Sequence, residues 1–203
     1  MVEKNISLPF SFYCLTEDDT LNWKYKPIPL NLDLDLESYW WKIQLFNLPW
    51  NSPTLYFDLD IVIQNNIDSI LQRIVPNKIL TIKPDDAGIE RQDDIIWSID
   101  SMINSSVIGI YPATVTPVYE RFIKAKDYNI VKYRGLDRYI TDNHMNICHY
   151  LKFDNDYYFR WKNDNTPDRY NSANGLAHDP RKTLCLICQE QSYMYEGLEK
   201  YFL

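Results

Sequence analysis

The chain has 203 residues, of which 45% are hydrophobic and 24% charged, so it can build the core of one α/β domain. Its net charge of −7 argues against a protein that holds a nucleic-acid backbone by charge. The first ten residues, MVEKNISLPF, lack the apolar region of a signal peptide, and no stretch is apolar for long enough to span a membrane. The four cysteines do not have the spacing of a disulfide framework, so we expect a soluble, cytoplasmic protein.

The first elements are short apolar segments separated by polar loops. Residues 10–16 are typical of a buried strand that runs into an acidic loop. The segment from Leu30 to Leu36 alternates strictly, with leucines on one face and the Asp33–Asp35 pair on the other. We expect water to solvate that pair of aspartates.

The remaining segments alternate between helical and strand-like patterns. Predicted helices cover residues 38–48, 67–74, 115–126, 135–140 and 194–203, and predicted strands cover 79–82, 101–110, 157–161 and 183–188. Helices that alternate with strands predict an α/β sheet that is at least partly parallel.

The segment TLYFDLDIVI, residues 54–63, places Asp58 and Asp60 one residue apart between two apolar runs. In a strand, residues i and i+2 point to the same side, so an extended segment would put both carboxylates on one face. Two carboxylates in apolar surroundings repel each other and lose hydration unless a cation lies between them. Since hard divalent cations choose oxygen ligands, the segment predicts a metal–phosphate site.

Five segments follow one another in a recognisable order: a strand ending in CLTED (14–18), a helix with WWK (40–42), the strand with DLD (58–60), NSSV (104–107) and RGLDR (134–138). Together they resemble the GT-A-fold glycosyltransferases with an Asp-x-Asp motif, and most closely bacterial or viral relatives of the glycogenin and galactosyltransferase group. The resemblance covers about residues 8–140 and implies a single GT-A-like domain over 1–203, with acceptor-side and C-terminal elements in 141–203. It implies a mixed, mostly parallel sheet flanked by helices, lacking part of the usual N-terminal βα unit.

The activity that this resemblance implies is metal-dependent transfer of a hexose from a nucleotide sugar, by family analogy a UDP-sugar, to a carbohydrate or glycoconjugate acceptor. Asp58 and Asp60 would hold Mn²⁺ or Mg²⁺, and Asp58 would also face the ribose. The ion would act as a Lewis acid on the charge that grows on the β-phosphate as the glycosidic bond breaks.

The resemblance also assigns donor-binding roles to four further residues. Thr16 and Lys42 match nucleotide-side positions, and Lys42 would contact the phosphates or order the Asp-x-Asp motif. Asn104 and Ser105 would face the sugar or the acceptor. From the residues alone, a surface lysine and a cap at the start of a strand are equally reasonable interpretations of Lys42 and Asn104.

Asp137 matches the acidic residue of a Gly-x-Asp-Gln motif, and this chain carries Arg138 at the usual glutamine position. A carboxylate there would orient a hydroxyl or act as a base, which makes Asp137 the predicted catalytic residue. The alternative is a helix-start aspartate paired with Arg134 or Arg138.

One departure from the family concerns a third metal ligand, usually a histidine after a late strand, where this chain has Cys188 and Gln189. Together with the missing part of the N-terminal βα unit, this departure favours a second hypothesis, a catalytically inactive GT-A-like protein that binds sugar or supports an assembly. A nucleotidyltransferase is disfavoured because the N-terminal region has no Gly/Arg-rich triphosphate loop.

Overall fold

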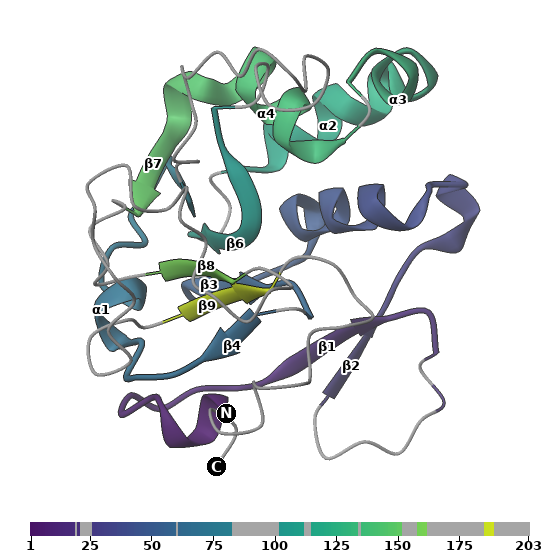
Figure 1. Ribbon diagram of the computed structural model, residues 1–203. Coiled ribbons are helices and arrows are strands. Elements are labelled where there is room, and N and C mark those ends of the chain that lie inside the picture. The colour runs from purple at the N-terminus through teal and green to yellow at the C-terminus, as the bar shows by residue number, and fades with distance from the viewer. Residues whose placement is uncertain are drawn as a thin grey trace.

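The computed structural model describes residues 1–18, 20, 26–59, 61–82, 102–111, 115–133, 135–151, 158–161 and 185–188, the last two segments as backbone only. The described residues form a mixed α/β fold whose strands make three sheets (Figure 1). The central sheet has the strand order β3 (Thr54–Phe57), β6 (Asn104–Ile110), β5 (Ile79–Ile82) and β7 (Cys148–Leu151). A two-stranded sheet pairs β1 (Tyr13–Thr16) with β2 (Lys26–Pro29), and a three-stranded sheet has the order β4 (Ile61–Ile63), β9 (Cys185–Cys188) and β8 (Tyr158–Trp161).

The helices lie mostly between the strands in sequence. They are η1 (Val2–Lys4), η2 (Leu32–Leu34), η3 (Ser38–Asn47), α1 (Asp68–Leu71), α2 (Thr116–Lys124), α3 (Lys126–Tyr133), α4 (Leu136–His144) and η4 (Met145–Ile147). Figure 1 shows α2, α3 and α4 together at the top of the molecule, with β1 and β2 at the bottom. No helix among the described residues has the length and apolar character needed to cross a membrane.

The expected mixed α/β architecture is confirmed, and its strand directions are evenly balanced. Within the described strands, β1–β2, β5–β7 and β8–β9 are parallel, whereas β3–β6, β5–β6 and β4–β9 are antiparallel. A mostly parallel sheet was expected, and the share of parallel strand pairs is lower than that, because β6 runs antiparallel to both of its neighbours.

Apolar side chains cover both faces of the central sheet. Along β5, Ile79 belongs to a core cluster with η3 and helices α2 to α4, whereas Leu80 belongs to a second cluster with α1 and β4. Successive strand residues point to opposite faces, so a sheet with a core on each side reads as a continuous apolar run. Tyr56 of β3 packs on the η3 side, and its neighbours Leu55 and Phe57 pack on the α1 side.

The predicted helix at 38–48 is present, but it is a 3-10 helix. A 3-10 helix has three residues per turn, so residues three apart share a face. Trp40, Ile43 and Phe46 have this spacing and are almost fully buried. These three residues form a buried stripe with a period of three, which Gln44 and Leu45 widen, and Lys42 lies off it.

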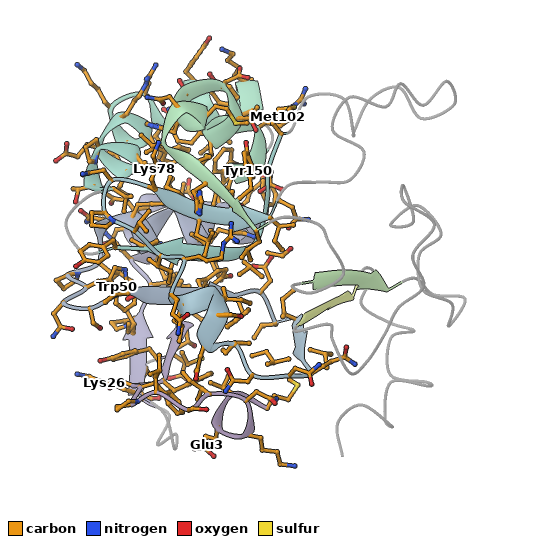
Figure 2. The ribbon with its side chains drawn as sticks, turned by 90° about the vertical axis from the view of Figure 1, so that its left-hand side faces the viewer. Glu3, Lys26, Trp50, Lys78, Met102 and Tyr150 are labelled. Carbon is orange, nitrogen blue, oxygen red and sulfur yellow. The ribbon has the colours of Figure 1, made fainter. Side chains whose placement is uncertain are left out.

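Trp50 connects the η3 region to the small parallel sheet. Its indole Nε1 donates to the carbonyl oxygen of Leu45 at 2.9 Å, and its ring meets the Tyr13 ring edge-on with centroids 6.0 Å apart. In Figure 2, Lys78 and Tyr150 lie above Trp50, and Lys26 lies below it. This contact ties β1 to the body that carries the central sheet.

Several other sequence predictions have clear outcomes. The strands predicted at 79–82, 101–110, 157–161 and 183–188 correspond to β5, β6, β8 and β9, and the helices at 67–74, 115–126 and 135–140 correspond to α1, α2 and α4. Helix α3 and strand β7 were not predicted. The prediction of a regular amphipathic element at 30–36 is wrong, because the segment forms the η2 turn instead. The predicted helix at 194–203 lies outside the described residues.

Candidate active site

The Asp-x-Asp segment is a turn between two strands, not part of one strand. β3 ends at Phe57, and the carbonyl oxygen of Asp58 accepts a hydrogen bond from the Ile61 amide at 3.2 Å, where β4 begins. β3 and β4 belong to different sheets. The segment is therefore not extended, as the shared face of the two carboxylates would require, because the chain turns at the motif. Asp60 lies outside the described residues.

Asp58 is held by a lysine from η3. The Lys42 Nζ lies 3.0 Å from Asp58 Oδ1 and 2.9 Å from Oδ2, and it also contacts the Ser105 carbonyl oxygen at 3.4 Å. The exposed fractions of the two side chains are 17% for Lys42 and 23% for Asp58. An ion pair at this depth is screened less than a surface pair, and loss of one partner would leave the other charge uncompensated. The structure thus places Lys42 against Asp58, not on an isolated surface.

Tyr56 is a contact of Asp58 that the sequence analysis missed. Its hydroxyl donates to Asp58 Oδ1 at 2.7 Å, and the Lys42 Nζ lies 6.0 Å from the centroid of its ring. The signal was present in the sequence, since Tyr56 stands two residues before Asp58 and so shares its side of the chain where the strand ends. The Asp58 carboxylate therefore has contacts from both β3 and η3.

The start of β6 is irregular, and the site is built on this irregularity. Thr81 pairs with Ile108, but the next residue of β5, Ile82, pairs with Asn104, so residues 105–107 lie between the two pairings. A bulge of this kind interrupts the regular hydrogen-bond ladder and often lies beside a functional site. The Ser105 amide donates to Asp137 Oδ1 at 3.0 Å, and its carbonyl oxygen faces Lys42.

Two further hydrogen bonds complete this irregular segment. The Ser106 amide donates to Asn104 Oδ1 at 2.8 Å, and the Ser106 carbonyl oxygen accepts from the Asp58 amide at 2.9 Å. Buried backbone groups need partners, and here the partners are the candidate functional residues themselves. The Asn104 side chain thus caps the start of the strand, as in the alternative interpretation of this residue. A role of Asn104 in binding the sugar or the acceptor stays a prediction.

Asp137 reaches the cluster from the first turn of α4. The residue is partly buried, and its Oδ1 accepts from the Ser105 amide. Arg134, one partner considered from the sequence, lies outside the described residues. Burial raises the pKa of its carboxyl, while the Ser105 hydrogen bonds and the Lys42 ammonium lower the pKa, and the Asp58 charge raises it further. Lys42, Asp58 and Asp137 thus share one electrostatic environment.

Thr16 has a local structural role in the described part of the chain. Its hydroxyl oxygen accepts from the Asp18 amide at 3.1 Å, and its carbonyl oxygen accepts from the Leu30 amide at 2.8 Å. These bonds shape the end of β1, and none of them reaches Lys42 or Asp58. The late position predicted to lack the usual histidine, Gln189, lies outside the described residues.

Comparisons with known proteins bear on the fold. No protein-family model matches the chain, and no curated protein is similar to it in sequence. Among solved structures, the chain is similar to the crystal structure of galactosyltransferase LgtC in complex with donor and acceptor sugar analogs, with a TM-score of 0.55. The two are 12% identical, and the match covers 88% of this chain and 73% of that chain. The likeness shows a GT-A-like fold, and the activity has to be argued from the site.

Proposed function

We propose that this protein is a glycosyltransferase that moves a sugar from a nucleotide-sugar donor, a UDP-sugar, to a carbohydrate-containing acceptor. The observation that carries the proposal is the convergence of Lys42, Asp58 and Asp137 at the irregular start of β6. The residues come from η3, the β3–β4 turn and α4, which are far apart in the sequence. The fold shared with a galactosyltransferase structure bound to sugar analogs supports the same reaction class.

The residues of this cluster suit the charges that such a reaction creates. The leaving group is a nucleoside diphosphate, on which negative charge grows as the glycosidic bond breaks. Lys42 offers an ammonium within a partly buried site, where it would stabilise that charge more than it would in water. The described hydrogen bond to the Asp137 carboxylate is from the Ser105 amide to Oδ1. Through Oδ2, Asp137 would orient a sugar hydroxyl, and a raised pKa suits a group that holds a proton there.

A divalent ion fits the ligand chemistry of Asp58. Oδ1 accepts from both Lys42 and Tyr56, whereas Oδ2 accepts from Lys42 alone among the described contacts, so Oδ2 retains a lone pair. The side chain is 23% exposed, which gives an ion access from solvent. In this proposal Asp58 and Asp60 would hold Mn²⁺ or Mg²⁺, which would supply Lewis-acid stabilisation of the diphosphate.

The first test is calorimetric titration of the protein with UDP in the presence and absence of Mn²⁺. We expect UDP to bind when Mn²⁺ is present, and we expect Asp58→Asn to weaken UDP binding at least tenfold. Asp33→Asn is the matched control, because Asp33 belongs to an Asp-x-Asp segment on the exposed surface. Absence of UDP binding with Mn²⁺, or equal UDP binding by both variants, would contradict the proposal.

The second test separates a transferase from a relative that binds donor without reacting. Lys42 already occupies both oxygens of Asp58, an arrangement that a non-catalytic donor-binding protein would also retain. At high protein concentration, the native protein should hydrolyse UDP-sugars, which is measured as release of UDP. The rate of UDP release should fall in Asp137→Asn. UDP binding without any turnover would favour the non-catalytic alternative.

A further inference from the structure

We propose that Lys42 is a built-in competitor for the cation site at Asp58, so that a divalent ion and a nucleotide diphosphate bind as a pair instead of independently. This inference rests on the proposed function, and it concerns how the site is loaded.

The geometry of the ammonium is the first step of the argument. An ammonium has three hydrogen-bond donors, and the Lys42 Nζ has three acceptors around it: the two Asp58 oxygens at 3.0 and 2.9 Å and the Ser105 carbonyl oxygen at 3.4 Å. The ammonium therefore uses its full donor capacity inside the protein. Asp58 is neutralised by Lys42 before any ligand arrives.

A divalent ion at Asp58 would meet this charge at close range. Metal–oxygen bonds to carboxylates are about 2.0–2.6 Å long, so the ion and the ammonium would share one carboxylate within a few ångströms. Like charges at that distance repel strongly in a partly buried site. The ion alone must either displace Lys42 from Asp58 or bind against its charge, and both alternatives weaken its binding.

A nucleotide diphosphate removes this conflict because it offers Lys42 other oxygen acceptors. Lysine binds phosphate as a mobile point charge on a flexible stem, so its Nζ can leave Asp58 for a nearby phosphate. Once Lys42 is paired with phosphate, the Asp58 oxygens are open to the ion. Thermodynamic linkage makes this coupling reciprocal, so the ion must improve nucleotide binding by the same factor.

Tyr56 provides a neutral comparison at the same carboxylate. Its hydroxyl donates to Asp58 Oδ1 at 2.7 Å but carries no charge, so it does not repel a cation. Removing the hydroxyl should weaken the positioning of the Asp58 carboxylate without changing the competition between Lys42 and the divalent ion. Tyr56→Phe is therefore the matched control for the loss of the Lys42 charge.

The deciding measurement is the affinity for Mn²⁺ without nucleotide, read from the electron paramagnetic resonance signal of free Mn²⁺. Lys42→Met and Lys42→Gln should each bind Mn²⁺ about tenfold more tightly than the native protein, a size typical of coupling between interacting sites. Lys42→Arg and Tyr56→Phe should stay within about twofold of the native protein, since neither changes the charge beside Asp58. Adding UDP should tighten Mn²⁺ binding more in the native protein than in the two uncharged variants.

The outcomes separate this inference from the proposed function. If Lys42→Met and Lys42→Gln bind Mn²⁺ alone no more tightly than the native protein, the inference is overturned, even where UDP binds as proposed. If the native protein binds no UDP in the presence of Mn²⁺, the proposed function itself fails. Thermal melting followed by circular dichroism identifies a variant that is unfolded, and the Gln variant retains hydrogen-bonding capacity if the Met variant does not fold.

Discussion

Two segments of this chain have the same Asp-x-Asp spacing and opposite surroundings. Asp33 and Asp35 lie in and after the η2 turn and are exposed. The local hydrogen bonds in this segment run from the Asp33 amide to Asn31 Oδ1 and from the Asp35 amide to the Leu32 carbonyl oxygen. Asp58 follows a strand of the central sheet and is held by Lys42 and Tyr56. The spacing is therefore uninformative by itself, and what distinguishes the segments is whether the preceding residues form a strand inside a sheet.

The position at the end of a strand explains why Asp58 finds partners. β3 is the edge of the central sheet that neighbours β6, and Tyr56 on β3 packs on the same side as η3. A residue two positions later continues on that side, toward the helix that carries Lys42. None of the ion pairs among the described residues involves Asp33, and the lysine that reaches its segment, Lys126, donates to the Leu34 carbonyl oxygen at 2.9 Å.

Replacing the first aspartate of each segment with alanine tests this comparison with the largest expected effect. Asp58→Ala leaves the partly buried Lys42 ammonium without its carboxylate, which should lower the free energy of unfolding by about 2 kcal/mol. Asp33→Ala removes an exposed side chain and should change it by less than about 0.5 kcal/mol. Urea denaturation followed by circular dichroism measures both. Equal effects of the two substitutions would mean that the Lys42 pair has no net stabilising role.

The sequence predicted the elements that carry the site better than it predicted the shape of the site. The strand before Asp58 and the helix that starts before Asp137 follow from local apolar patterns, which depend on nearby residues. The resemblance to a known family selected Lys42, Ser105 and Asp137 in addition, and the structure brings them to Asp58. The roles assigned to these residues remain predictions.

Other parts of the site required three-dimensional information. The turn at Asp58 depends on β3 and β4 joining different sheets. The apolar residues on either side of the motif are equally typical of one long strand, so the local pattern does not predict the turn. The register shift between Thr81 and Ile82 depends on which residues of two distant strands pair. No local pattern indicates such a shift, since it is set by long-range partners of the backbone, here Asp137 and Lys42.

Asp137→Asn extends the comparison to a partly buried carboxyl whose described contact is a hydrogen bond from the Ser105 amide. Because burial raises the folded-state pKa above 3.8, the native protein binds this proton more tightly than the unfolded chain does. Its contribution to stability is therefore largest at low pH and is lost as pH rises through the folded-state pKa, with a slope of at most about 1.4 kcal/mol per pH unit. Asparagine does not titrate and can still accept from the Ser105 amide.

The measurement is urea denaturation of the native protein and Asp137→Asn from pH 4 to pH 8. The free energy of unfolding of the native protein should fall relative to the variant as pH rises. A difference that grows in favour of the native protein at high pH would show that Lys42 and Ser105 outweigh burial, and that the pKa of Asp137 is lowered.

Tyr56→Phe should have a smaller effect than loss of either charge. The substitution keeps the ring that packs beside η3 and removes only the hydroxyl that donates to Asp58 Oδ1. A hydrogen bond to a charged acceptor contributes about 1.5–3 kcal/mol, and partial exposure of Asp58 lowers the expected loss to about 1 kcal/mol. In the background of Asp58→Ala the same change should cost much less, and full additivity in this double-mutant cycle would contradict the contact.

The smallest expected effect belongs to Asp35, the second aspartate of the exposed segment. Its φ of 47° lies in the left-handed region, where glycine has no steric cost and aspartate has a modest one. Asp35→Gly relieves that cost but adds flexibility to the unfolded chain, so the two terms should cancel to within about 0.5 kcal/mol. Asp35→Ala keeps the steric cost and replaces aspartate with a residue that tolerates the left-handed region less well, so it should be the less stable of the two by thermal melting. The order of these variants depends on backbone conformation alone, whereas the order at Asp58 depends on charge. If the alanine and glycine variants melt at the same temperature, the left-handed turn at Asp35 does not form in solution. The two Asp-x-Asp segments would then differ in the charges around them and not in this feature of the backbone.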